Sequence, residues 1–167
     1  MAQLDTAILN SLQAICGEDR VLTDEESLRY YGRDWTRFYE PSPCAVVLPA
    51  SIEEVQSIVR LAAEQQLSLV PSGGRTGLSA GGVARNGELV IALDRLNQID
   101  DFNPVDRTVR CGAGVITEQL QQLAEEQGLY YPVDFATSGS SQIGGNISTN
   151  AGGIKVIRHG MTRDWVA

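Results

Sequence analysis

The amino-acid sequence predicts an α+β protein made of two subdomains, in which a βαβ lobe is followed by a mixed lobe. Three observations support this fold class. Short apolar runs alternate with helical periodicity in the first half, a hairpin pattern opens the second half, and glycine is concentrated in two stretches. The 167 residues are enough for a self-sufficient hydrophobic core.

The N-terminal region is expected to be helical. Apolar residues recur every three or four positions over residues 4–15, which predicts an amphipathic helix. Thr23 and Glu26 match a capping box, so a second, short helix should follow and end near Tyr31. The segment 35–43 has no periodicity of either kind and is expected to be irregular.

A βαβ unit is expected next. The apolar run 45–48 predicts a buried strand, and Ser51 with Glu54 forms a second capping box that begins a helix. The apolar face of this helix is predicted to consist of Ile52, Val55, Ile58, Val59 and Ala62. A second strand over 67–70 should stop at Pro71, and the two strands should be parallel with a right-handed crossover.

The pattern changes after a further strand expected at 88–93. Apolar segments at 99–102 and 108–111 flank a turn sequence rich in Asn, Pro and Asp, which predicts a hairpin. A helix is expected over 116–127, and the segment 141–149 is interrupted by glycine.

Composition excludes several classes of protein. Thirteen Lys and Arg against 21 Asp and Glu give a net charge of −8, which disfavours nucleic-acid binding. An apolar share of 43% excludes a disordered chain, and no apolar run is long enough to cross a membrane. Residues 1–10 lack the features of a secretory signal, so a cytoplasmic location is expected.

The metal-binding and redox residues are few. Cys16, Cys44 and Cys111 form no CxxC pair and have apolar neighbours, so buried, unreactive thiols are expected. His159 is the sole histidine, which excludes a histidine-based triad and makes a metal site within this chain improbable.

Two stretches, 72–87 and 137–163, combine many glycines with a lack of carboxylates. They hold twelve of the 17 glycines, none of the 21 acidic residues and five of the 13 cationic residues. Bare backbone lets N–H groups approach a ligand, whereas carboxylates would repel an anion. The pattern favours an anion site over the alternative of two ligand-free surface loops.

The first stretch begins with PSGGRTGLS at 71–79, directly after a predicted strand. It is not a Walker A loop, because no Gly-Lys-Ser/Thr ends it. Its glycine N–H groups can still form a nest around a phosphate. Ser72, Thr76 and Ser79 would add hydroxyl donors, and Arg75 would supply charge.

The second stretch contains two Gly-Gly pairs, within 137–146 and 149–153, each beside Asn and hydroxyl residues. These donors without acids suit a diphosphate and a polar ring system. Asp134 is expected to fix this loop by an Asx-type turn, with direct ligand contact as the alternative. Trp35 and Trp165 are expected to pack rather than to form a stacking platform.

The segment GAGVIT at 112–117 offers a competing nucleotide signal. It contains two-thirds of a Rossmann GxGxxG, but Thr117 replaces the third glycine and no second βαβ pair follows. Gly112 and Gly114 are more simply explained by close packing at the start of the next helix.

Taken together, the two glycine-rich motifs resemble the FAD-binding domain of the vanillyl-alcohol oxidase type (PCMH-type), in the branch of D-2-hydroxy-acid dehydrogenases. The residues that carry the resemblance are PSGGRTGLSAGG at 71–82 and GSSQIGGNISTNAGG at 139–153, extended by VDF at 133–135 and IRHGMTRDWV at 157–166. The resemblance begins near Pro41 and covers about three-quarters of the chain.

The resemblance implies a set of FAD-binding residues. Positions in both glycine-rich stretches would contact the diphosphate, the ribityl chain or the flavin. These are Ser72, Gly73, Gly74, Arg75, Thr76, Gly77, Ser79, Thr137, Ser138, Ser141, Gly144, Gly145, Asn146, Thr149 and Asn150. Members that bind flavin covalently carry a histidine after the first Gly-Gly. Arg75 occupies that position and the second stretch has no cysteine, so non-covalent FAD is implied.

The resemblance also implies an activity. Within the branch the chain is most similar to D-2-hydroxyglutarate and D-lactate or glycolate dehydrogenases, and Asp134 with Gly139 and Ser140 favours the hydroxyglutarate kind. Such proteins oxidise a D-2-hydroxy acid to the 2-oxo acid by hydride transfer to FAD. Electrons pass on to a quinone or an electron-transfer flavoprotein. The alternatives are a non-redox module that binds nucleotide diphosphates and a Rossmann-type nicotinamide domain.

The resemblance implies three parts: an N-terminal helical segment at 1–40, a first FAD-binding subdomain at 41–103, and an incomplete second subdomain at 104–167. Relatives continue further, with a substrate domain that carries the catalytic base and any metal. The chain is therefore expected to be a C-terminally truncated fragment, with no catalytic residue or metal ligand assigned to it. Such a fragment should be inactive alone and can pair into a homodimer; peripheral attachment to the inner membrane is a further option.

Overall fold

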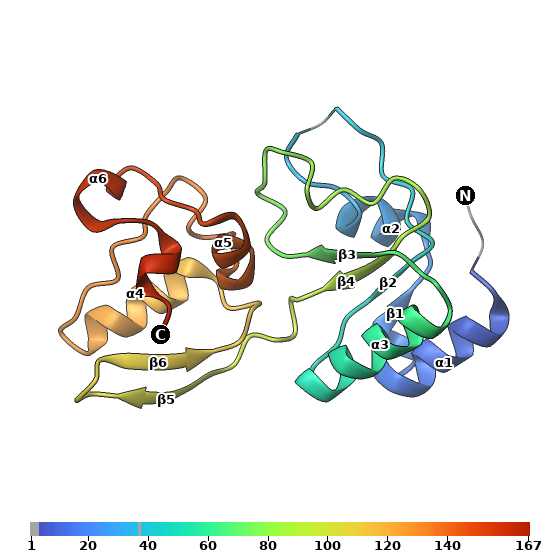
Figure 1. The fold of residues 1–167 in the computed structure, drawn as a ribbon, viewed down its shortest axis with the longest axis horizontal. Coiled ribbons are helices and arrows are strands. Elements are labelled where there is room, and N and C mark those ends of the chain that lie inside the picture. Colours follow the sequence, from blue (N-terminus) through green and yellow to red (C-terminus); the bar gives the residue numbers. More distant parts are fainter. Residues whose placement is uncertain (1–3, 37) are drawn as a thin grey trace. The chain divides into compact units, whose positions relative to one another are not determined.

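The computed structural model describes residues 4–36 and 38–167, and the chain forms two compact units, Met1–Arg95 and Leu96–Ala167 (Figure 1). The first unit contains α1 (Thr6–Cys16), the 3-10 helix η1 (Glu18–Arg20), β1 (Val21–Leu22), α2 (Glu25–Tyr31), β2 (Ala45–Val47), α3 (Ile52–Glu64), β3 (Leu69–Ser72) and β4 (Leu89–Ala92). The second contains β5 (Ile99–Asn103), β6 (Thr108–Cys111), α4 (Thr117–Glu126), α5 (Ile143–Thr149), α6 (Val156–His159) and the 3-10 helix η2 (Thr162–Trp165). The predicted α+β class is confirmed.

The first unit is built on a four-stranded sheet in the order β1-β2-β4-β3. Strands β2, β4 and β3 are parallel, and β1 is antiparallel to β2. The predicted parallel direction is thus confirmed, but β2 and β3 are not neighbours. Val90 of β4 pairs with Val46 of β2 on one side and with Val70 of β3 on the other. Strand β4, which follows the first glycine-rich stretch in the sequence, therefore lies between β2 and β3.

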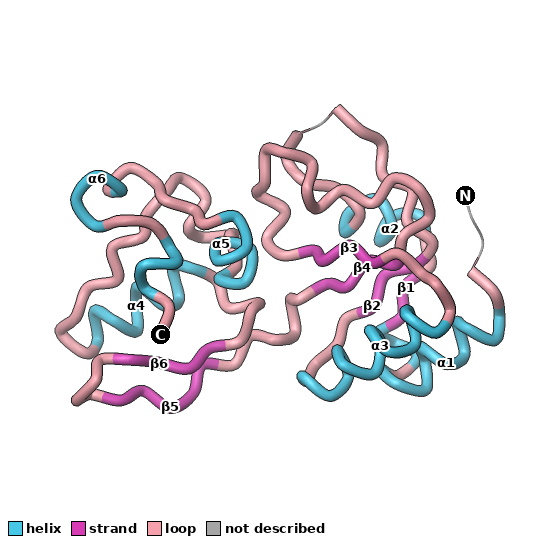
Figure 2. The backbone as a smooth tube through the Cα atoms, in the orientation of Figure 1, coloured by secondary structure: helices cyan, strands magenta, loops and turns pink. Residues whose placement is uncertain are grey.

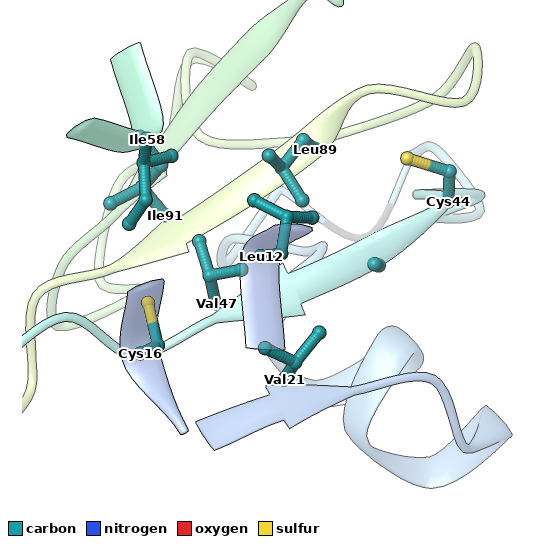
Figure 3. Close-up of a cluster of buried hydrophobic side chains, with 9 residues drawn as sticks. Leu12, Cys16, Val21, Cys44, Val47, Ile58, Leu89 and Ile91 are labelled. Atoms are coloured by element: carbon teal, nitrogen blue, oxygen red, sulfur yellow. The ribbon is translucent and has the colours of Figure 1, made fainter. Parts of the chain in front are cut away.

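The central strands are buried on both faces, as parallel strands usually are. On one face, Leu12 and Cys16 of α1 and Ile58 of α3 pack against Val47 and Leu89 (Figure 3). Because successive strand residues point to opposite faces, the intervening side chains face α2. They form a second core with Leu28 of α2, which includes Val46, Ala84, Val90 and Ala92.

Two predicted helix features need correction. The N-cap of α2 is Asp24, whose carboxylate accepts from the Ser27 N–H, and not Thr23. Ser51 does cap α3, but Ile52 and Val59 on the predicted apolar face are 68% and 45% exposed. The buried stripe of α3 is narrower than predicted and consists of Ile58 and Ala62, because only the side of the helix that faces α1 and the sheet is covered.

Strand β3 continues through Pro71 to Ser72, past its predicted end. Proline cannot donate to a neighbouring strand, but β3 is the edge strand and β4 lies on one side of it only. This extension fixes Ser72 in the sheet, so the glycine-rich loop begins at Gly73.

The second unit packs the predicted hairpin β5–β6 and helix α4 around Val115, Leu120 and Ile143. The segment expected only to be interrupted by glycine folds as helix α5. The boundary between the compact units falls between Arg95 and Leu96, ahead of the subdomain boundary expected after residue 103. The hairpin explains the difference, because its two strands cannot belong to separate units. None of the helices in the described ranges is long and apolar enough to cross a membrane.

Candidate FAD-binding site

The first candidate site is the loop of residues 73–79, which follows the carboxyl end of β3 (Figure 2). Within the described residues, no backbone N–H of this loop donates to a protein acceptor. Arg75 adopts a left-handed conformation with φ of 58°, which is unusual for a residue other than glycine. A left-handed residue among unpaired N–H groups is the geometry of an anion-binding nest.

The Arg75 side chain turns back to the protein and does not extend from the loop as a free cation. Its guanidinium forms two bonds to Asp94, of 3.1 and 3.3 Å, and donates to the carbonyl of Gly73 at 2.8 Å. It also donates to Tyr30 and lies over the rings of Tyr30 and Tyr31. Burial alone would lower the pKa of this guanidinium, but the hydrogen bond and charge of Asp94 raise it. The expectation that Arg75 supplies charge to a phosphate is therefore corrected: its charge is neutralised by Asp94, and its side chain fastens the loop.

The three hydroxyl residues predicted as donors are not equivalent. Ser72 is 2% exposed and donates to the carbonyl of Tyr31 at 2.9 Å, so its hydroxyl joins β3 to α2. Thr76 and Ser79 have no side-chain partner within the described ranges, and Ser79 is exposed. Only the last two hydroxyls are available to a ligand.

Asp34 adjoins the same loop, and sequence reasoning missed it. The N–H of Trp35 donates to the carbonyl of Gly77 at 2.9 Å, which ties this segment to the loop. Asp34 is 9% exposed, and its Oδ2 lies 3.5 Å from the position that a Cβ on Gly77 would occupy. Asp34 lies between the predicted short helix and the irregular segment 35–43 and belongs to no motif, so no signal in the sequence marks it.

The second stretch is organised differently, around a buried hydroxyl network. Thr117 at the start of α4 is fully buried, and its Oγ1 lies 2.7 Å from Ser141 Oγ. The Asn146 side chain donates to the same Oγ1 at 2.7 Å. Ser141 and Asn146, predicted to face the cofactor, are 1% and 5% exposed. Their side chains instead join α5 to α4, and Thr117, regarded only as a missing glycine, is the centre of the network.

The glycines of the second stretch have separate roles. A Cβ on Gly144 would lie 2.7 Å from the Cβ of Ala113, so this glycine permits close packing of α5. A Cβ on Gly145 would meet nothing within 4 Å, so this backbone faces open space. Gly145 is therefore the glycine of this helix that leaves room for a ligand.

The remaining predicted positions lie in the segment that precedes α5 and at the C-terminal end of that helix. Thr137 and Thr149 are exposed and Ser138 is partly exposed. The Thr149 hydroxyl donates to the Gly145 carbonyl. Asn150 ends α5 in a left-handed conformation, and its Oδ1 accepts from the Arg163 N–H. Asn150 thus also positions the C-terminal segment.

Asp134 fixes the second stretch, but not by an Asx-type turn. Its backbone forms a parallel bridge with Gly153, and its carboxylate forms a 2.8 Å ion pair with Lys155. Lys155 also donates to the Tyr130 hydroxyl at 2.6 Å. These hydrogen bonds, the one with Asp134 foremost, raise the pKa of Lys155. Trp165 packs edge-to-face with Tyr131, while its indole N–H donates to the carbonyl of His159.

The Rossmann alternative does not match the structure. The 112–117 segment follows an antiparallel hairpin and not the first strand of a βαβ unit. Gly112 lies so close to the Leu96 carbonyl that a Cβ would collide with it. The N–H of Gly114 donates to that same carbonyl at 2.9 Å. Close packing explains this glycine pair, as predicted from the sequence.

The cysteines are unreactive by location. Cys16 and Cys44 are buried, and Cys111 is partly buried. Burial raises the pKa of Cys16 to about 11, and it also raises the pKa of Cys44 and of Cys111. Thiolate chemistry at neutral pH is therefore suppressed at all three positions. Within the described ranges, no group of His, Cys, Asp and Glu side chains is arranged to hold a metal ion.

The residues present fit a nucleotide diphosphate. The loop 73–79 contains no carboxylate, and its N–H groups and the hydroxyls of Thr76 and Ser79 have no partner in the part of the chain that the structure describes. Gly145 offers backbone that a side chain would cover. Taken separately, each of these two features would let an anion such as the diphosphate of FAD approach bare backbone.

Comparison with known proteins identifies the family. The model of the FAD binding domain family matches residues 43–167, so this chain belongs to that family. It is 61% identical over 163 residues to a D-2-hydroxyglutarate dehydrogenase of Stutzerimonas stutzeri, a match that covers 98% of this chain and 35% of that protein. A mitochondrial D-2-hydroxyglutarate dehydrogenase of Arabidopsis thaliana is 36% identical over 159 residues, covering 95% of this chain and 28% of that protein.

The fold agrees with solved structures. An alkyldihydroxyacetonephosphate synthase superposes with a TM-score of 0.87 at 20% identity, over 97% of this chain and 35% of that one. This likeness confirms the predicted fold. The family match and the sequence relatives confirm the predicted FAD-binding domain and the resemblance to D-2-hydroxy-acid dehydrogenases. This chain spans about a third of the length of the curated relatives that it matches.

Proposed function

We propose that this chain is the FAD-binding part of a flavin-dependent dehydrogenase that oxidises a D-2-hydroxy acid, D-2-hydroxyglutarate before lactate or glycolate, to the 2-oxo acid. The observation that carries the proposal is the nest of unpaired N–H groups at 73–79, in a chain that is 61% identical to a D-2-hydroxyglutarate dehydrogenase. Bound FAD would supply the hydride acceptor.

The chain's own part in this function is to bind and orient the cofactor. The N–H groups of Gly73, Gly74, Arg75, Thr76 and Gly77 would donate to the diphosphate, with the hydroxyls of Thr76 and Ser79 beside them. The Arg75 side chain would hold the loop in this form before the cofactor arrives, through Asp94 and Tyr30. A pre-formed loop loses less conformational freedom on binding and so binds more tightly.

The second stretch would contribute further cofactor contacts. Thr137, Ser138, Gly144, Gly145, Thr149 and Asn150 would line the cofactor, whereas Ser141 and Asn146 would act by holding α5 in place. FAD would be held without a covalent bond, because Arg75 stands after the first Gly-Gly and 137–153 contains no cysteine or histidine.

The partners of the whole protein follow from the same proposal. The substrate is a small 2-hydroxy acid, the electron acceptor is a quinone or an electron-transfer flavoprotein, and nucleic acid is not a partner. A cytoplasmic location is proposed, with peripheral contact at the inner membrane where a quinone is the acceptor, and a homodimer is the proposed assembly.

The test of the cofactor and substrate class is the visible absorbance of the gene product that contains this chain. Flavin bands should be present after purification and should bleach on anaerobic addition of D-2-hydroxyglutarate. Bands that bleach only with D-lactate or glycolate would move the substrate within the class. A colourless protein that binds ADP as tightly as FAD would contradict the proposal and favour a non-redox nucleotide-binding module.

A glycine pair tests the location of the site. A Cβ on Gly81 or on Gly145 would have no atom within 4 Å, so a new side chain should be tolerated at both. Gly145→Val should lower FAD content at least tenfold, because the side chain fills the proposed cofactor space, whereas Gly81→Val should retain FAD. Equal FAD content in both variants would contradict the assignment of α5 to the site.

A further inference from the structure

The carboxylate of Asp34 lies beside the first glycine-rich loop, and only one of its two oxygens accepts hydrogen bonds from the described residues. Its Oδ1 accepts from the N–H of Thr36 at 2.9 Å and from the Thr36 hydroxyl at 2.7 Å. Its Oδ2 is buried and has no hydrogen-bond partner in the part of the chain that the structure describes. The two oxygens of one carboxylate therefore have different roles.

An unpaired buried carboxylate oxygen is costly, because the charge has lost water without gaining a donor. The loop beside it does not supply that donor, although the N–H groups of 73–79 also have no acceptor among the residues that the structure describes. Oδ2 lies at the Gly77 side of the loop, where any side chain on residue 77 would come into contact with it. Oδ2 is thus positioned to accept a hydrogen bond from a donor on a bound ligand.

The nest and the carboxylate together restrict what that donor is. An anion bound to the loop would be repelled by Asp34 unless the ligand also presented a hydrogen-bond donor close to its phosphates. The sugar hydroxyls of a nucleotide meet this requirement, since they lie within a few bonds of the diphosphate. In Rossmann folds an acidic residue recognises a ribose hydroxyl in a similar way, beside a glycine-rich phosphate loop. A bound cation is disfavoured, because the described residues contain no cluster of acidic, His and Cys side chains around Asp34.

We propose that Asp34 is a cofactor-binding residue whose Oδ2 accepts a hydrogen bond from a sugar hydroxyl, ribose or ribityl, of the dinucleotide bound at 73–79. This inference rests on the proposed function. It adds a specificity element outside the matched family region 43–167. The loop would recognise the phosphates, and Asp34 would recognise the sugar next to them.

The test compares four proteins: the wild type, Asp34→Ala, the isosteric Asp34→Asn, and Thr36→Val as a matched control. Thr36→Val removes one bond to Oδ1 and leaves Oδ2 in place. Affinities are measured by fluorescence titration or calorimetry for FAD, ADP, FMN and inorganic pyrophosphate. ADP contains only the ribose, FMN only the ribityl chain, and pyrophosphate neither, so the probes distinguish the two sugars.

Asp34→Ala should weaken FAD binding about 10- to 100-fold, the usual loss for a hydrogen bond to a charged group. Asp34→Asn should lose less, since an amide oxygen still accepts. The same loss should appear with ADP or with FMN, whichever carries the recognised sugar, but not with pyrophosphate. Thr36→Val should bind FAD within about threefold of wild type even where its melting temperature falls.

Two results would overturn the inference alone. One is FAD affinity within twofold of wild type in both Asp34 variants; the other is tighter binding of all four ligands, which would show that Asp34 only repels the diphosphate. Wild-type protein that does not bind FAD would instead overturn the proposed function, and this inference with it.

Discussion

The two glycine-rich stretches have similar compositions, yet the structure uses them in opposite ways. In the first, the N–H groups of residues 73–79 have no acceptor within the described ranges 4–36 and 38–167, and the Arg75 side chain fastens the loop to Asp94. In the second, the chain folds into helix α5, and polar side chains are buried around Thr117. The first stretch thus presents a set of backbone donors, whereas the centre of the second stretch is a packed scaffold in which Ser141 and Asn146 are buried against Thr117.

The difference shows that a lack of carboxylates can have two physical causes. In the first loop a carboxylate would repel a bound anion. In the second, a carboxylate near Thr117 would be buried without a cationic partner, which is costly whether or not a ligand binds. Local composition alone does not distinguish these causes. The two causes can be distinguished by substitutions, which should affect ligand binding in the first stretch and stability in the second.

The largest effect is expected at Gly153, a structural glycine of the second stretch. Its φ is 83°, and a Cβ would collide with the carbonyl of Asp134 across the bridge that they form. Gly153→Ala should lower the free energy of unfolding by about 3 kcal/mol, through the clash and the strained φ. Chemical denaturation measures this.

Gly145→Ala serves as the control for that substitution. It adds the same methyl group within α5 but meets nothing, so stability should be unchanged or higher by up to about 1 kcal/mol. Equal losses in the two variants would show that the second stretch is uniformly packed.

A pair of threonines sharpens the comparison at a smaller scale. Thr117→Val keeps the side-chain shape but removes the acceptor of Asn146 and the partner of Ser141. It should lower the free energy of unfolding by about 2 kcal/mol, because a buried donor is left unpaired. Thr76→Val in the first loop should change stability by less than about 0.5 kcal/mol and lower FAD affinity instead. The reverse outcome would mean that the first loop is the scaffold.

The smallest effect concerns Cys16, in the core of the first unit and away from both stretches. Burial raises its pKa in the folded protein to about 11, above the ordinary value of 9.0. As pH rises from 8 to 10, the unfolded chain loses its thiol proton first and is stabilised by the ionised form. The folded protein should therefore lose about 1 kcal/mol of stability over this range. Cys16→Ala should remove that part of the slope, as pH-dependent denaturation would show, and leave FAD binding unchanged.

Elements governed by local pattern were predictable from the sequence. The helix at 4–15, the strand at 45–48 and the hairpin at 99–111 depend on periodicity and turn residues within one short segment, and each is present in the structure. The glycine-rich character of 72–87 and its place after a strand were predictable for the same reason.

Other features were decided by contacts between distant segments. Strand β4 takes its place between β2 and β3 because its apolar residues complete both cores, a pairing that no local pattern specifies. Thr117 joins Ser141 and Asn146 across 24 and 29 positions of the chain. Their hydroxyl and amide groups look the same in the sequence whether they face a cofactor or each other.

The first loop shows the same division between sequence and fold. The sequence by itself determined where bare backbone N–H groups would be available, because glycine content is a local property. Only the tertiary structure decided that the Arg75 charge is neutralised by Asp94, and that one oxygen of Asp34, beside Gly77, has no hydrogen-bond partner among the described residues. Charge and hydrogen-bond pairing depend on distances between side chains, and those distances are fixed only when the chain has packed.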